Sequence, residues 1–138
     1  MSPLRYLTRY LIAASLVGIF ATLMRLAADV SGFGLEAVVT GDGRNVIGAY
    51  ANFCAVKIYW SLMFGGVVWA LPRLALQSLV ASNDLKIYLI QGSLGFAILN
   101  YAVFQHPLFL LQGAGEGALW GAAIWILDRR YAVRGRWA

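Results

Sequence analysis

The chain has 138 residues, of which 61% are hydrophobic and 12% are charged, and its formal net charge is +5. Soluble domains carry about 25% charged residues, so half that share with this much apolar surface excludes an ordinary soluble protein. The basic residues flank apolar segments, which indicates contact with the headgroups of a lipid bilayer, anionic ones included, and argues against a nucleic-acid-binding surface.

Four apolar segments are long enough to cross a bilayer as helices, which takes about 20 residues each. We expect them at Tyr10–Ala28, Val46–Leu71, Lys86–Phe104 and Leu108–Leu127. The sequence therefore predicts an all-α integral membrane bundle of four transmembrane helices, forming one domain over residues 1–138. Arg25 near the end of the first segment, and the lack of a small-residue cleavage site, indicate a retained helix rather than a signal peptide.

The residues between these segments are typical of turns and helix ends. Val30–Asn45 is rich in Gly, Ser and Asp, which predicts a polar loop. Pro72 follows the second segment, where a helix is expected to stop or kink. Residues 82–84 (Ser-Asn-Asp) offer an N-cap to the third helix, and Pro107 suits the first turn of the fourth.

The basic residues predict how the chain is oriented. The first loop is mainly acidic, whereas both tails and the second link are basic, so the positive-inside rule places both termini in the cytoplasm. A preference for Arg over Lys, with abundant Ala and Gly, is typical of a bacterial inner membrane protein. The arginines of the two tails are predicted membrane-surface anchors: Arg5, Arg9, Arg129, Arg130, Arg134 and Arg136.

The second helix has two possible registers. If Tyr59–Ala81 were the span, Lys57 would reach the outer interface and Arg73 would be buried. In the Val46–Leu71 register Lys57 is buried instead. Either charge costs about 2.5–3.5 kcal/mol on insertion scales. We prefer Val46–Leu71, because Pro72 and Arg73 follow it and Glu116 can compensate Lys57.

Lys57 and Glu116 are ionisable residues within the most apolar parts of the chain. Lys57 lies 11 residues after Val46, and Glu116 lies 8 after Leu108. At ~1.5 Å per residue their depths are about 16 and 12 Å on helices that run the same way. We therefore expect them to pair inside the bundle. The pair either fixes helix register or, with the nearby Gln112 and Ser61, binds an anionic or protonatable ligand.

Glycines at helical spacing predict close packing between helices. The fourth helix has a GxxxGxxxG run, a common mark of membrane helix association. The predicted packing residues are Gly113, Gly117 and Gly121 in that helix, and Gly18, Gly65, Gly92 and Gly95 in the others.

Motifs of common enzyme classes do not occur in the sequence. It has no HExxH, GxSxG or Walker loop. One His and one Cys do not suffice for a metal or haem site built from several side chains. We therefore expect neither catalytic activity nor a cofactor.

The end of the fourth helix, Trp125-Ile126-Leu127-Asp128-Arg129-Arg130-Tyr131, resembles the Asn-Arg-Arg-aromatic ending of GtrA-like proteins. These are small four-helix membrane proteins implicated in moving polyprenyl-phosphate sugars. The family's second motif, expected near the middle of the chain, is absent, since Trp69-Ala70-Leu71-Pro72-Arg73 does not reproduce it. The resemblance thus covers a few residues, and we carry no site over from it.

Two functions follow from the sequence. The first is a non-catalytic accessory or assembly subunit that packs against itself or other membrane protein subunits, as the glycine faces favour. The alternative is a small transporter or flippase-like protein for an ion or a polyprenyl-phosphate-linked sugar, using Lys57 and Glu116.

Overall fold

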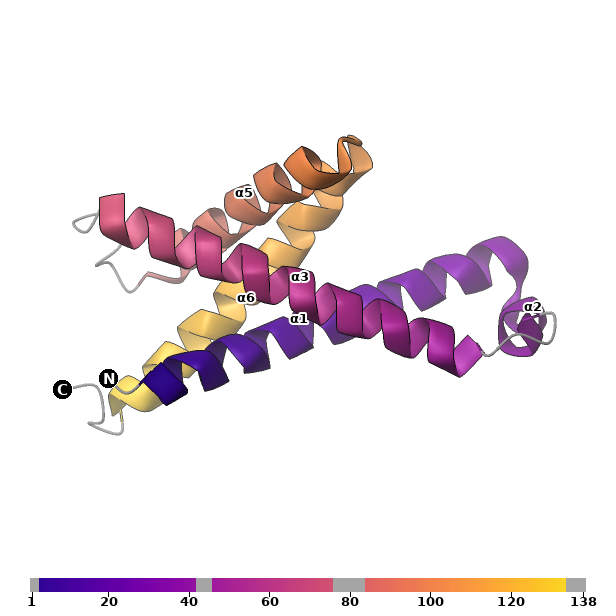
Figure 1. The fold of residues 1–138 in the computed structure, drawn as a ribbon, viewed down its shortest axis with the longest axis horizontal. Helices are drawn as coiled ribbons and strands as arrows, with labels where there is room; N and C mark the ends of the chain where they lie inside the picture. Colours follow the sequence, from indigo (N-terminus) through magenta and orange to yellow (C-terminus); the bar gives the residue numbers. More distant parts are fainter. Residues whose placement is uncertain (1–2, 42–45, 76–83, 134–138) are drawn as a thin grey trace.

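The fold is described here from a computed structural model, which defines residues 3–41, 46–75 and 84–133. These residues are almost entirely helical and include no strand. In chain order the helices are α1 (Pro3–Phe33), α2 (Leu35–Thr40), α3 (Val46–Ala75), α5 (Leu85–Phe104) and α6 (Leu108–Val133) (Figure 1).

Among the described residues, three segments are long and apolar enough to cross a membrane: Leu7–Phe33, Val46–Trp69 and Leu85–Phe104. The 26 residues of α6 are also long enough, but this helix carries Gln112, Glu116 and four glycines and does not reach the same apolar character. The protein is thus helical with three helices able to span a membrane, and the fourth span stays a prediction.

The long helices form two hairpins that cross (Figure 1). In the first, α1 packs against α3; in the second, α5 and α6 are joined by a short link at residues 105–107 and pack closely along their length. The hairpins contact each other mainly through α1 and α6, and also through α3 and α5. The start of α1 and the end of α6 lie at the same end of the molecule, and α2 lies at the other.

An aromatic core fills the crossing. Trp120 of α6 is fully buried, stacks on Tyr10 of α1 at 5.8 Å between ring centroids, and contacts Phe96 of α5 at 5.6 Å. Many other large apolar side chains point outward, including Leu111 at 77% exposure. Outward apolar side chains suit a protein whose surrounding solvent is lipid.

The predicted loop Val30–Asn45 is wrong over much of its length. α1 continues to Phe33, and α2 follows almost at once. Glycine marks the helix ends rather than a long loop, since Gly34 and Gly41 have φ of 84° and 51°, which glycine adopts without strain. The apolar run between these glycines therefore forms a short helix.

α3 begins at Val46, where the preferred register begins, and it continues past Pro72 to Ala75, so Pro72 does not stop the helix. The end of the alternative register, at Ala81, lies outside the described residues. Proline has no N–H, so the carbonyl of Val68, four residues earlier, loses its helical donor. Gln91 of α5 replaces that donor, since its Nε2 donates to the Val68 oxygen at 2.8 Å.

Replacing Gln91 by Leu should lower the free energy of unfolding by about 1–3 kcal/mol, because the Val68 carbonyl is then left without a partner. In a Pro72→Ala background the new N–H can bond that carbonyl, and the same change should cost less. Thermal unfolding of four detergent-purified proteins measures the difference: the unchanged protein, the two single variants and the double variant. An equal cost with Pro or Ala at residue 72 would show that Gln91 stabilises something else.

Residues close in sequence cap the helix ends of the second hairpin. Asp84, one of the three predicted caps, is the N-cap of α5 and accepts a hydrogen bond from the Lys86 N–H at 3.1 Å. Gln105 ends α5 with a φ of 53°. His106 Nδ1 then accepts from the Leu108 N–H at 3.2 Å, so this histidine caps α6, which begins one residue after Pro107.

Candidate functional site

Lys57 of α3 and Glu116 of α6 lie in contact inside the bundle. Lys57 Nζ is 2.9 Å from Glu116 Oε1, and the two side chains are 10% and 4% exposed. Each hairpin thus contributes one residue of the pair. The depth estimate places the two residues at similar levels, and the helix faces bring their side chains together.

A third side chain completes this polar cluster. Gln112, one turn before Glu116 on α6, donates from Nε2 to the same Oε1 at 2.9 Å. Phe53 lies one turn before Lys57, with its ring 5.9 Å from Nζ. Ser61 is buried one turn after Lys57, but within the described part of the chain no hydrogen bond joins it to the pair.

Burial decides what the Lys57–Glu116 pair can do. Removing two charges from water costs several kcal/mol each, and their attraction offsets part of that cost. The pair therefore joins α3 to α6 directly but adds little net stability. Glu116 Oε2 accepts no hydrogen bond from the described residues, so this oxygen has spare capacity for a proton or a ligand.

All seven predicted packing glycines approach another helix. A Cβ on Gly92 of α5 would overlap the backbone of Gly117 on α6, and the reverse holds as well. Gly113 and Gly121 face the carbonyls of Phe96 and Tyr88 on α5. The others lie against side chains: Gly18 on Ile58, Gly65 on Trp120 and Gly95 on Val68. The absence of a Cβ thus sets the spacing of these helices.

Arg9 forms a second buried cluster that the sequence reasoning missed. We expect it as a surface anchor, but it is only 3% exposed and is bonded to Asp128 of α6. Tyr88 of α5 donates to the other oxygen of Asp128 at 2.8 Å. Asp128 is the one acidic residue in the last two turns of α6, and these turns meet the start of α1 in the bundle. A lone acidic residue in an otherwise basic helix end is the signal that could have revealed the pair.

The remaining predicted anchors divide into two groups. Arg129 and Arg130 are exposed, and Arg129 lies over the Trp125 ring at 4.6 Å. The side chain of Arg5, like Arg134 and Arg136, lies outside what the structure describes.

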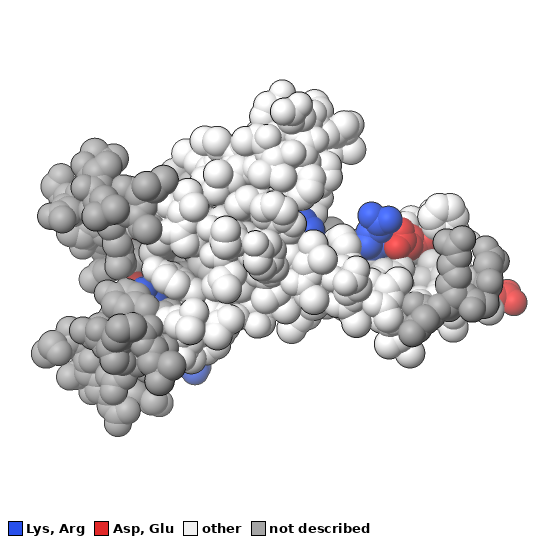
Figure 2. Space-filling model, viewed as in Figure 1, with Lys and Arg blue, Asp and Glu red and all other residues white. Residues whose placement is uncertain are grey.

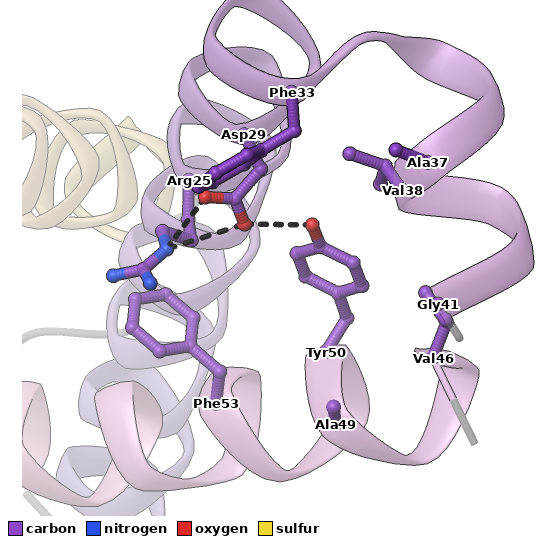
Figure 3. Close-up of a pocket in the computed structure, with 10 residues that line it drawn as sticks. All are labelled: Arg25, Asp29, Phe33, Ala37, Val38, Gly41, Val46, Ala49, Tyr50 and Phe53. Carbon is purple, nitrogen blue, oxygen red and sulfur yellow. Dashed lines mark hydrogen bonds and ion pairs between the residues drawn. The ribbon is translucent and has the colours of Figure 1, made fainter. Parts of the chain in front are cut away.

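A third cluster joins α1 to α3 at the end of the molecule where α2 lies. Arg25 Nε is 3.2 Å from Asp29 Oδ1, a pair one helical turn apart. Tyr50 of α3 donates to Asp29 Oδ2 at 2.8 Å. These three residues line an open cavity of about 610 Å³ (Figure 3). Neither Lys57 nor Glu116 lines it.

Among residues 3–41, 46–75 and 84–133, no three His, Cys, Asp or Glu side chains come together as metal ligands would. No protein-family model, curated protein or solved structure matches this chain. The likeness to GtrA-like proteins therefore stays confined to residues 125–131. The fold therefore defines a class of protein: a small helical protein whose described residues include three helices able to cross a membrane.

Proposed function

We propose that the protein crosses a bacterial inner membrane four times, with both termini in the cytoplasm. α6 supplies the fourth span, since its 26 residues reach about 39 Å and its glycines pack on α5. The basic residues near both ends of the sequence support the orientation. Figure 2 agrees with a membrane position, because the face that it shows is mostly uncharged between the two ends.

Within that membrane we propose a non-catalytic role, as an accessory or assembly subunit that binds another membrane helix or a second copy. The observation that carries this is one uncovered face of α6. Leu108, Leu111, Gln112 and Gly115 follow helical spacing and are all exposed. Gln112 keeps hydrogen-bonding capacity that lipid cannot satisfy, and Gly115 has no heavy atom within 4 Å of where a Cβ would lie. Small and amide residues on one face are typical of helix association.

The interior of the bundle also supports packing over conduction. Glu116 and Asp128 are 12 residues apart on α6, about 18 Å along its axis. Trp120 and Ile124 lie between them and are 0% exposed. An apolar core thus separates the Lys57–Glu116 cluster from the Arg9–Asp128 cluster.

The test is the size of the purified complex. Gly115→Leu should fill the uncovered face and reduce the mass measured by sedimentation in mild detergent to that of one chain. Gly66→Leu is the matched control, because Gly66 also has open space about its Cα but lies on α3. An unchanged mass for Gly115→Leu would contradict association through this face.

The second candidate is transport of an ion or a polyprenyl-phosphate-linked sugar. Two observations favour it: the spare capacity of Glu116 Oε2, and an exposed Gln112 that gives this carboxylate access to the surface of the bundle. Flux into reconstituted vesicles that disappears in Glu116→Gln would establish transport and overturn the accessory role. Equal flux through vesicles with and without the protein would exclude it.

A further inference from the structure

The cavity between α1, α2 and α3 has an apolar wall and a polar side. Phe33, Ala37, Val38, Val46 and Phe53 are among the apolar residues that line it, while Arg25, Asp29 and Tyr50 supply the polar groups. Figure 3 shows Asp29 between the other two, joined to the Tyr50 hydroxyl on one side and to Arg25 Nε on the other, with the terminal nitrogens of Arg25 directed away from it. At about 610 Å³ the cavity has the size of ordinary small-molecule sites.

Asp29 organises the polar side. It accepts from Arg25 Nε on α1 at 3.2 Å and from Tyr50 Oη on α3 at 2.8 Å. The side chain of Asp29 is 23% exposed and that of Arg25 is 60% exposed. Both ionised groups are therefore held in place by neighbours while remaining reachable from outside.

Each group also keeps unused hydrogen-bonding capacity. A guanidinium carries five N–H donors and a carboxylate has about four acceptor positions. Within the described part of the chain, the terminal nitrogens of Arg25 donate no hydrogen bond and Asp29 accepts from two donors only. A phosphate oxygen fits the terminal nitrogens of Arg25, and an ammonium fits Asp29.

The charge balance limits the ligand class. Among the described residues, Arg25 and Asp29 are the charged ones that line the cavity, and they cancel. The charge of Asp29 already compensates Arg25, so a purely anionic ligand gains little from Arg25. For the same reason a purely cationic ligand gains little from Asp29. A ligand that carries both charges a few ångströms apart gains from both residues.

The position of the cavity indicates an amphiphile. Apart from those of α2 and Gly41, its residues occupy the last turns of Leu7–Phe33 and the first turns of Val46–Trp69, two segments able to span a membrane. In a bilayer these helix ends lie at the headgroup level, with acyl chains beside the adjacent turns.

We propose that this cavity binds a phospholipid with a zwitterionic phosphate–amine head group. The phosphate lies on the terminal nitrogens of Arg25, the ammonium lies on Asp29, and the first part of an acyl chain lies against Phe33, Val38 and Phe53. Phe53 lines the cavity and also lies near Lys57 Nζ, but neither Lys57 nor Glu116 lines it, so the proposal does not depend on the proposed function.

The probe is dioctanoyl phosphatidylethanolamine, titrated into detergent-purified protein and followed by native mass spectrometry. It should bind at least tenfold more tightly than dioctanoyl phosphatidylglycerol. Arg25→Gln and Asp29→Asn should each weaken it about tenfold, since each removes one charge-assisted hydrogen-bonding partner. Ala49→Trp, which fills the cavity from α3, should weaken it without altering either charge.

Arg129→Gln is the matched control, because it removes an exposed arginine at the other end of the molecule, and it should leave the dissociation constant unchanged. Equal binding of phosphatidylglycerol would overturn the zwitterionic preference. Equal binding of free phosphoethanolamine would show that the apolar wall contributes nothing and would overturn the lipid assignment. Arg25→Gln that binds like the unchanged protein would overturn the site itself.

Discussion

Glu116→Gln is expected to lower the free energy of unfolding by about 3 kcal/mol. The change leaves Lys57, whose side chain is 10% exposed, without the charge that compensates it. Breaking a buried ion pair by removing one partner costs about 3–5 kcal/mol. We expect a loss at the lower end of this range, because the amide oxygen of the new Gln can still accept a hydrogen bond from Lys57.

The diagnostic measurement is a double-mutant cycle. Lys57→Met together with Glu116→Gln should recover part of the loss, since no buried charge is then left. Lys86→Met is the control, because Lys86 is exposed and its loss should be nearly neutral. Thermal unfolding in detergent compares the four proteins of the cycle. Simple additivity of the two single changes would refute the coupling between Lys57 and Glu116.

Counting residues along a helix predicts depth well and orientation around the helix axis poorly. The levels of Lys57 and Glu116 follow from the rise per residue once each helix start is known. The pairing of Arg9 with Asp128 depends on which way each side chain faces, which a net-charge rule for surface anchors does not address. The sequence therefore supports one cluster and leaves the other to the structure.

Helix ends show a similar division between local and tertiary causes. Asp84 caps α5 through its own neighbourhood, so local rules suffice. Pro72 is an exception, because Gln91 from another helix bonds the carbonyl that proline leaves without a donor. That compensation comes from 19 residues further along the chain and cannot be deduced from the turn signals around Pro72.

The polar clusters hold different pairs of helices. Asp29 and Tyr50 join α1 to α3 within one hairpin, whereas Lys57 and Glu116 join the two hairpins. Asp128 joins α6 to α1 through Arg9. Since apolar side chains gain little by leaving lipid for protein, such polar contacts and backbone packing determine which helices associate.

Gly117→Ala is expected to lower the free energy of unfolding by about 1–3 kcal/mol, the usual cost of overpacking. Its Cβ would overlap the backbone carbonyl of Gly92 on α5 and come within 2.8 Å of Phe96 Cβ. A backbone group cannot rotate away as the end of a side chain can, so the two helices must separate. Separation weakens the contact along the second hairpin.

Gly115→Ala is the matched control, two residues away on the same helix. A Cβ there meets no heavy atom within 4 Å, and alanine favours a helix over glycine by up to about 1 kcal/mol. The two substitutions add the same methyl group, so opposite signs in thermal unfolding isolate the α5–α6 contact. If Gly117→Ala were as stable as Gly115→Ala, the helices would not be in backbone contact at Gly92, and the glycine seam would not set their spacing.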